Sequence, residues 1–145
     1  RRLTKIFKKN KIEFYDDYAH HPTEIKSVLE SFRKVTSKRK IISVFQPHRY
    51  SRIKSLKSQF ASSFKNCDQV ILCPVYAAGE SINHGYIDKN FAQLISKYSK
   101  TQVILIENEN NLSKYLKKNL IKDEIVIGMG AGSISKWMHN LKNIL

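Results

Sequence analysis

Cysteine is scarce in this sequence, which contains only Cys67 and Cys73. The two residues lack the spacing of metal ligands and have no further thiols to pair with, so the pattern excludes a disulfide-stapled scaffold. We expect both to be buried thiols of a protein from a reducing compartment. A redox or metal-binding role is the alternative.

Long apolar runs are also absent. No stretch approaches the roughly 20 apolar residues that a membrane-spanning helix needs, so we expect no membrane partner. The sequence begins with Arg1-Arg2 rather than Met, and no apolar run of a secretory signal follows. We therefore expect the chain to be part of a longer polypeptide or to have been trimmed. Its 145 residues, 41% of them hydrophobic, suffice for one domain with a buried core.

Acidic residues are few: 12 Asp and Glu stand against 26 Lys and Arg, and the formal net charge is +14. Such a charge is compatible with nucleic-acid binding, which would show as salt-sensitive affinity. However, the lysines are scattered along the whole chain, and only Lys8-Lys9 and Lys38-Arg39-Lys40 form local clusters. We expect no nucleic-acid partner; an acidic partner or a more acidic domain of the same protein is the alternative explanation of the charge.

The spacing of apolar residues alternates between the period of a strand and the period of a helix. We predict a hairpin over 3–7 and 11–15 and strands at 40–45, 69–73, 102–106 and 124–127, those at 69–73 and 102–106 being buried. We predict helices at 22–35, 51–64 and 88–98, a short helix marked by Leu112 and Leu120, and a closing helix marked by Ile134 and Leu141. In the helix at 88–98, Asp88 is a candidate N-cap and Tyr98 should face inward.

This alternation of strand and helix predicts an α/β fold. We expect one domain over residues 1–145, with an open, mostly parallel Rossmann-like sheet, helices on both faces and an N-terminal antiparallel hairpin strand.

Residues 16–22 concentrate ionisable side chains at the point where a strand passes into a helix. The run Asp16-Asp17-Tyr18-Ala19-His20-His21-Pro22 holds two carboxylates, a phenol and two imidazoles. Ligands of open α/β sheets bind at the carboxyl ends of the strands. The sequence therefore predicts a ligand site in this turn.

Three other polar segments, 46–52, 76–80 and 128–133, follow predicted strands, so all four should meet at one edge of a parallel sheet. In the first of them, Arg49 and Arg52 are three residues apart at a helix start, where one turn would bring both to the same side. Paired guanidinium groups can bind a carboxylate or a phosphate in a bidentate manner. Ordinary surface ion pairs are the alternative.

The segment 128–133 places Gly128, Gly130 and Gly132 between a strand and a helix. Such a turn can bring backbone amides and a helix N-terminus close to an anion, or it can serve only close packing. The chain has no Gly-x-x-x-x-Gly-Lys-Ser/Thr loop, so it is not a self-sufficient ATPase of that type.

In this order, the four segments resemble the C-terminal domain of the Mur ligase family, in the form found in UDP-N-acetylmuramate–L-alanine ligases. Arg1-Arg2-Leu3 resembles the stretch where the central domain of those ligases passes into the last one. Two alternatives are the ligases that recycle a muramoyl tripeptide, whose second motif usually lacks the His-Arg-Tyr-Ser/Thr-Arg form, and a stand-alone nucleotide-binding module. The matching runs are 16–25, 45–52, 76–80 and 129–134.

The resemblance implies an ATP-dependent ligase of cytoplasmic peptidoglycan synthesis, which joins L-alanine to UDP-N-acetylmuramate through an acyl-phosphate intermediate. It implies ATP and Mg²⁺ as cofactors, bound mainly by a central domain, and a UDP site in a first domain. Neither of those domains is within this chain, so both are expected as partners, and the isolated chain is expected to be inactive.

The resemblance also assigns roles in the first two segments. It implies that Asp17 meets the ribose of the nucleotide, with a helix cap as the alternative. Tyr18 and His20 resemble residues that line the site for L-alanine and phosphate. For His21 a cap on the following helix is the alternative, and for Tyr18 and His20 the alternative is packing as core side chains.

In the second segment, His48, Arg49 and Arg52 resemble the group that holds the alanine carboxylate and the transferring phosphate. The resemblance thus implies His20, Arg49 and Arg52 as catalytic residues and no metal ligand in this domain. Gly130, Gly132 and Glu80 are expected to shape loops.

Overall fold

The computed structural model describes residues 3–145, so the Arg1-Arg2 part of the interdomain resemblance lies outside the described residues. Within this range no helix is both long and apolar enough to cross a bilayer. The strands are β1 (Thr4–Lys9), β2 (Ile12–Asp17), β3 (Ile41–Phe45), β4 (Gln69–Leu72), β5 (Gln102–Leu105) and β6 (Ile125–Met129). The helices are α1 (Pro22–Val35), α2 (Tyr50–Ala61), α3 (Asp88–Ser99), α4 (Glu109–Asn119) and α5 (Ile134–Asn140), with a 3₁₀ turn at Leu141–Asn143.

The described strands form one sheet in the order β1-β2-β6-β3-β4-β5. β1 pairs with β2 in an antiparallel hairpin, and Asn10 and Lys11 turn the chain between them with φ of 52° and 63°. Positive φ at both central residues is typical of the two-residue turns whose twist matches a hairpin. The other four pairings, from β2 to β5, are parallel. This confirms the predicted sheet and places the carboxyl ends of five strands at one edge.

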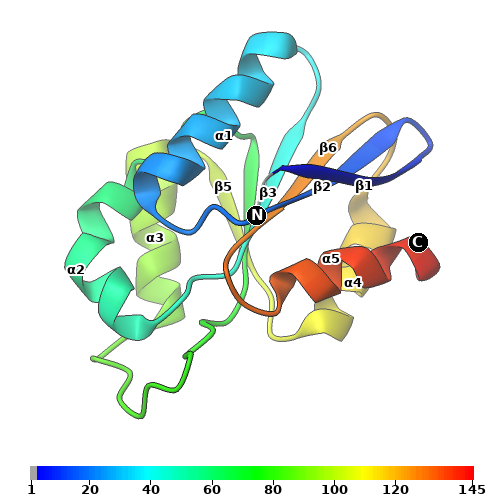
Figure 1. Cartoon of the computed structure of the whole chain (residues 1–145). Helices are drawn as coiled ribbons and strands as arrows, with labels where there is room; N and C mark the ends of the chain where they lie inside the picture. Colours follow the sequence, from blue (N-terminus) through cyan, green and yellow to red (C-terminus); the bar gives the residue numbers. More distant parts are fainter. Residues whose placement is uncertain (1–2) are drawn as a thin grey trace.

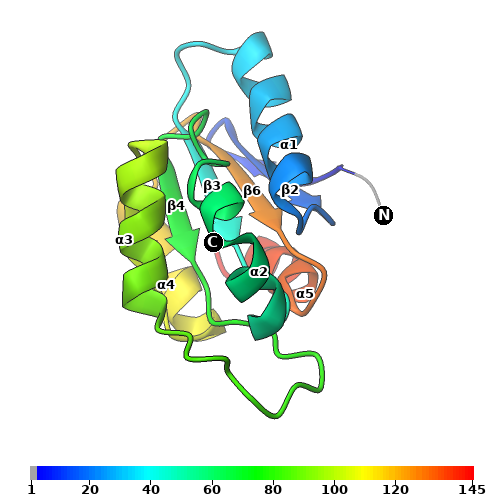
Figure 2. The same ribbon diagram turned by 90° about the vertical axis from the view of Figure 1, so that its left-hand side faces the viewer.

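Helices cover both faces of the sheet, as predicted. Figure 1 shows α1, α2 and α3 on one side and α4 and α5 on the other, and Figure 2 looks onto the first group. Each strand contributes side chains to the hydrophobic cores on both faces of the sheet, because alternate side chains point to opposite faces. In β3, Ile41 and Phe45 pack in the core beneath α1, α2 and α3, whereas Ile42 and Val44 pack in the core beneath α4 and α5.

Helix α1 has the bounds that the sequence predicts. Pro22 occupies its first turn, where a missing N–H has no cost and the fixed φ suits a helix. Ile25, Leu29 and Phe32 follow at helical spacing and are buried. The helix therefore starts directly after the ionisable turn, residues 18–21, and fixes the direction in which this turn leaves β2.

Three local predictions are wrong. β5 is the edge strand of the sheet, so it is only partly buried, and Leu105 is 40% exposed. Asp88 lies in the first turn of α3, whose N-cap is Ile87. Tyr98 is 51% exposed, because α3 packs mainly through Phe91 and residues near it.

Both cysteines are buried and free, in agreement with the sequence-based expectation. Burial raises the pKa of the Cys67 thiol to about 12 and raises the pKa of Cys73 as well. Because the thiolate is the reactive form, neither side chain is activated for redox chemistry.

Candidate functional site

The four polar segments meet at the carboxyl edge of the sheet, as predicted. Backbone hydrogen bonds join each segment to its neighbour: Gly130 N–H donates to the Asp17 carbonyl at 3.3 Å, and Gln46 N–H donates to the Met129 carbonyl at 3.0 Å. Arg49 N–H donates to the Tyr76 carbonyl at 2.8 Å. The parallel order β2-β6-β3-β4 thus brings together residues that are more than 100 positions apart in the sequence.

The two aspartates lie on the end of β2 rather than in the turn after it, and both are buried. Asp16 Oδ2 accepts a hydrogen bond from the Ser135 hydroxyl at 2.6 Å, on the side of α5. Asp17 Oδ1 accepts from Ala19 N–H at 2.7 Å and so turns the chain directly after the strand. The helix-cap alternative for Asp17 is wrong, because the N-cap of α1 is His21.

Glu24 fixes the backbone of the two histidines from inside α1. Its Oε1 accepts the N–H groups of His20 and His21, both at 3.1 Å. Partial burial raises the pKa of Glu24, but these hydrogen bonds and the two nearby imidazoles outweigh it and hold the pKa below its ordinary value. His21 therefore takes the capping role that the sequence left open, and its side chain is exposed.

The imidazole of His20 has a defined tautomer when it is neutral. Its Nδ1 lies 2.8 Å from the Tyr18 carbonyl oxygen, which can only accept a hydrogen bond. Nδ1 therefore carries the proton, and Nε2 keeps its lone pair. The ring also contacts the edge of the Tyr18 ring, with centroids 5.0 Å apart.

The imidazole of His48 has the opposite polarity. Arg52 Nη1 lies 3.1 Å from His48 Nδ1, and because a guanidinium only donates, Nδ1 accepts and Nε2 carries the proton. Burial and then the charge of Arg52 lower the pKa of His48 below its ordinary value of 6.5. The ring stacks on Tyr76 at an interplanar angle of 15°, which fixes its orientation.

The two imidazoles are neighbours, with ring centroids 5.8 Å apart and an interplanar angle of 60°. The ionisable turn after β2 and the arginine-bearing turn after β3 therefore lie on the same part of the sheet edge. Of the residues predicted from the sequence, the structure brings together Tyr18, His20, His48 and Arg52.

Arg49 differs from its prediction. It is the N-cap of α2 and has a φ of 74°, so it precedes the helix instead of sharing a helical turn with Arg52. A residue other than glycine in such a conformation typically costs about 1–3 kcal/mol and persists only where its surroundings hold it. Its side chain is exposed. Arg49 thus presents its charge to solvent at the entrance of α2, while Arg52 is held against His48.

Glu80, expected only to shape a loop, binds the first backbone amides of α2. Its carboxylate accepts Tyr50 N–H at 2.6 Å and Ser51 N–H at 3.3 Å. Hydrogen bonds from Ser51 and Tyr50 hold the pKa of Glu80 below its ordinary value. The first turn of α2 contains no acidic residue of its own, so the sequence indicates that an acceptor must come from elsewhere but does not identify Glu80 as that acceptor.

The glycine turn after β6 serves close packing. A Cβ on Gly130 would lie 2.9 Å from the Gln46 carbonyl oxygen, and one on Gly132 would lie 2.7 Å from Cδ1 of Tyr76. The first amide of α5 is already occupied, because Ile134 N–H donates to Gln46 Oε1 at 3.1 Å. Of the two alternatives left open by the sequence, the structure supports packing over an anion site.

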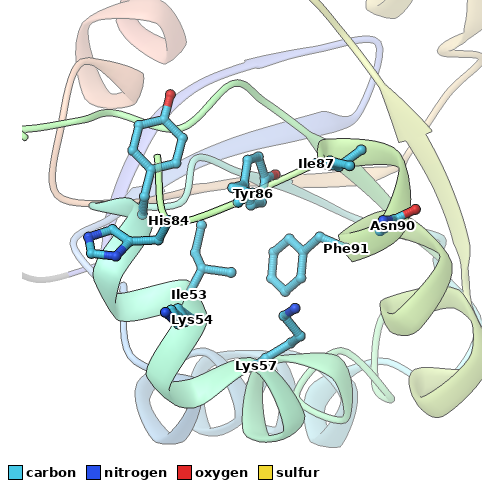
Figure 3. Close-up of a pocket in the computed structure, with 10 residues that line it drawn as sticks. Ile53, Lys54, Lys57, His84, Tyr86, Ile87, Asn90 and Phe91 are labelled. Carbon is cyan, nitrogen blue, oxygen red and sulfur yellow. The ribbon is translucent and has the colours of Figure 1, made fainter. Parts of the chain in front are cut away.

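A small hollow of about 50 Å³ lies beside this edge (Figure 3). Lys54 and Lys57 of α2 border it on one side, and Tyr86 and Phe91 border it on the other. It has room for one or two waters, since each occupies about 30 Å³ of liquid volume. None of the site residues predicted from the sequence lines it.

The carboxyl edge of the sheet presents several hydrogen-bond donors that can bind an anion. Arg49, Arg52 and the Nε2–H of His48 can bind carboxylate or phosphate oxygens, and His20 Nε2 can accept a proton. Among residues 3–145, no three His, Cys, Asp or Glu side chains are grouped so as to hold a metal ion.

Comparisons with known proteins identify the family to which the chain belongs. Residues 1–132 match the family described as "Mur ligase, glutamate ligase domain". The chain is 48% identical over 145 residues to the UDP-N-acetylmuramate–L-alanine ligase of Pelagibacter ubique, an alignment that covers 100% of this chain and 31% of that protein. The chain thus spans about a third of the length of this relative.

Two solved structures share the fold. The crystal structure of the UDP-N-acetylmuramate–alanine ligase of Thermotoga maritima superposes with a TM-score of 0.76 at 26% identity, covering 99% of this chain and 29% of that one. A murein peptide ligase from Psychrobacter arcticus gives a TM-score of 0.78 at 18% identity over the same shares of the two chains. At that identity the second likeness concerns the fold alone.

Proposed function

The chain belongs to the Mur ligase family, and on this premise we propose that it is the C-terminal domain of an ATP-dependent UDP-N-acetylmuramate–L-alanine ligase. The observation that supports this most is the convergence of His20, His48 and Arg52 at one sheet edge, in segments that resemble that ligase. The 48% identity to the Pelagibacter enzyme over the whole chain favours L-alanine as the amino acid. The fold does not distinguish this enzyme from a murein peptide ligase, because the two solved structures superpose with TM-scores of 0.76 and 0.78.

In the proposed reaction, ATP supplies the phosphoryl group that activates the muramate carboxylate, and the amine of L-alanine then attacks. Arg49 and Arg52 bind the alanine carboxylate and stabilise negative charge that develops on phosphoryl and carbonyl oxygens. Such fixed donors act mainly by positioning the reactants.

The two imidazoles have complementary tasks in this proposal. His20 Nε2 has a lone pair and accepts the proton that the alanine ammonium must lose before it can attack. His48 Nε2–H donates to a substrate oxygen, and its lowered pKa keeps it neutral at pH 7. Tyr18 lines the alanine site beside His20.

Asp17 suits a nucleotide ribose, since a carboxylate at a loop junction can accept from hydroxyl groups. It is 8% exposed, and its Oδ1 accepts Ala19 N–H at 2.7 Å, which fixes the carboxylate at the end of β2. As the resemblance to the family implies, we assign Mg²⁺ and the phosphate loop to another domain of the enzyme. The proposed partners are therefore the first two Mur ligase domains, and the proposed location is the cytoplasm.

A domain exchange tests the proposed function. The chain is joined to the first two domains of the Pelagibacter ligase in place of that enzyme's own last domain. We expect the chimera to form UDP-N-acetylmuramoyl-L-alanine, ADP and phosphate from L-alanine. A folded chimera that ligates only the tripeptide L-alanyl-γ-D-glutamyl-diaminopimelate, or that ligates nothing while the parent enzyme is active, contradicts the proposal.

A further inference from the structure

Helix α2, which carries Arg52 and begins after Arg49, has no cap of its own. Arg49 at the N-cap position makes no side-chain capping hydrogen bond, and the first turn contains no acidic residue. The first N–H groups of a helix have no partner within the helix, so they need acceptors from elsewhere. A carboxylate is well suited to this position because it also complements the helix dipole.

The loop after β4 provides that acceptor. Glu80 Oε1 accepts Tyr50 N–H at 2.6 Å and Oε2 accepts Ser51 N–H at 3.3 Å, across 30 and 29 positions of sequence. These are the two residues that directly follow Arg49. The carboxylate therefore holds the helix start from outside it.

Tyr76 reinforces the same junction. Its N–H donates to the Pro47 carbonyl at 2.8 Å, its carbonyl accepts Arg49 N–H at 2.8 Å, and its ring stacks on His48. The loop after β4 is thus joined to the loop after β3 by backbone pairing at one end and by Glu80 at the other. The strained Arg49 lies between these two attachments, with a φ of 74°.

We infer that Glu80 is a positioning residue of the ligase, which holds the start of α2 so that Arg49, Arg52 and His48 face the alanine carboxylate. This inference rests on the proposed function. The hydrogen bonds of Glu80 go to Tyr50 and Ser51, neither of which is a candidate substrate-binding residue, and its charge acts on His48 only as a minor electrostatic contribution. It acts through the backbone of Tyr50 and Ser51, and its loss lets the strained turn at Arg49 relax.

Hydrogen exchange on the chain itself tests the structural half of the inference. In Glu80→Ala, the amides of Tyr50 and Ser51 should exchange about tenfold faster or more, because their acceptor is gone. Glu80→Gln keeps an acceptor oxygen and should retain most of the protection. Unchanged exchange at both amides in Glu80→Ala overturns the inference.

A matched control separates positioning from a general loss of stability. Asn108 caps α4 by accepting Asn111 N–H at 2.8 Å, and α4 carries none of the candidate site residues. Asn108→Ala should shift the denaturant midpoint of unfolding to lower concentration, as the loss of a helix cap typically does. It should leave exchange at Tyr50 and Ser51 unchanged.

Steady-state kinetics of the domain-exchange ligase test the functional half. Glu80→Ala should raise the KM for L-alanine by about tenfold or more and leave the KM for ATP within about twofold, with partial rescue in Glu80→Gln. An equal rise of both KM values, or the same rise in Asn108→Ala, overturns the positioning role. An inactive unsubstituted chimera would contradict the proposed function instead, and hydrogen exchange would then decide whether Glu80 holds the helix.

Discussion

His20 and His48 lie side by side, yet their hydrogen bonds give them opposite polarity. His20 Nδ1 donates to a carbonyl and leaves a lone pair on Nε2, whereas His48 Nδ1 accepts from Arg52 and leaves a proton on Nε2. One side chain can therefore accept a proton while its neighbour donates a hydrogen bond at the same pH. Arg52 has a double task in this arrangement, because it fixes the tautomer of His48 and also presents a charge to the site.

The charge of Arg52 should be measurable in the titration of His48. Burial is the first cause of the lowered pKa of His48, and Arg52 is the second. In Arg52→Ala the pKa should move up toward 6.5, as followed by NMR of the imidazole on titration. Lys54→Ala, an exposed change on the same helix, should leave the titration as it is. An unchanged pKa in Arg52→Ala would show that Arg52 does not act on the ring.

The lowered pKa of His48 also determines whether the folded chain gains or loses stability as the pH falls. Because the pKa of His48 is lower in the folded chain, the unfolded chain binds this proton first. Well above pH 6.5 His48 does not change the free energy of unfolding, because the ring is uncharged in both the folded and the unfolded chain. As the pH falls below 6.5 toward the pKa of the folded chain, the free energy of unfolding decreases. Arg52→Ala should reduce this loss, as seen in denaturant unfolding at pH 7.5 and pH 5.5.

Arg52 should also matter more for alanine than for ATP. We expect Arg52→Ala in the domain-exchange ligase to raise the KM for L-alanine by about tenfold to a hundredfold, since a charge-assisted hydrogen bond to a carboxylate contributes about 1.5–3 kcal/mol. The KM for ATP should change far less. Equal changes of the two KM values would argue against a carboxylate clamp.

At the scale of elements, the site depends on loops that pack against each other. Gly132 adjoins the ring of Tyr76, and that ring in turn stacks on His48. A side chain at position 132 therefore acts on His48 through an intervening residue.

Gly132→Ala should destabilise the fold by about 1–3 kcal/mol, as overpacking typically does, and should displace the His48 resonances in NMR spectra. Gly85→Ala is the control, since nothing lies within 4 Å of a Cβ there, although its φ of 74° adds backbone strain. Its cost should be about 1–2 kcal/mol from the left-handed backbone alone, without an effect on His48. Undisturbed His48 resonances in Gly132→Ala would contradict the packing argument.

The elements themselves were largely predictable because most are determined by local periodicity. Helix α1 has its predicted bounds, since Pro22 and the apolar spacing act within one helix. β5 was wrongly expected to be buried, because an apolar sequence does not reveal whether a strand lies at the centre or the edge of a sheet. Asp88 was wrongly placed at the N-cap because a favourable residue type was available one position after the helix boundary.

In the whole molecule, the segments that follow β2, β3, β4 and β6 lie together because these four strands are parallel and end at the same edge of the sheet. That convergence could be predicted from the order of strands and helices alone. The contacts of Glu80 and Gln46 could not, because each bridges two loops whose separation depends on the complete fold. The conformation of Arg49 was missed for the same reason, since its neighbours across the sheet edge impose it.

In the proposed function, the hydrogen-bond donors at the carboxyl edge of the sheet bind only part of the substrates, and other domains of the ligase bind the rest. We therefore expect the isolated chain to show no ligase turnover, because its sequence contains no Gly-x-x-x-x-Gly-Lys-Ser/Thr phosphate loop. The assay follows phosphate release in the presence of ATP, L-alanine and UDP-N-acetylmuramate. Turnover that depends on both ATP and L-alanine would overturn this expectation.

In the proposed ligase, the turns after β2 and β3 form one site for the carboxylate of L-alanine. The most direct test of this site is a crystal structure of the domain-exchange ligase with its product, UDP-N-acetylmuramoyl-L-alanine. We predict that the alanine carboxylate lies within hydrogen-bonding distance of Arg52 or Arg49, with the new amide next to His20. A product whose alanine lies away from this sheet edge, with the enzyme closed around it, would contradict the account.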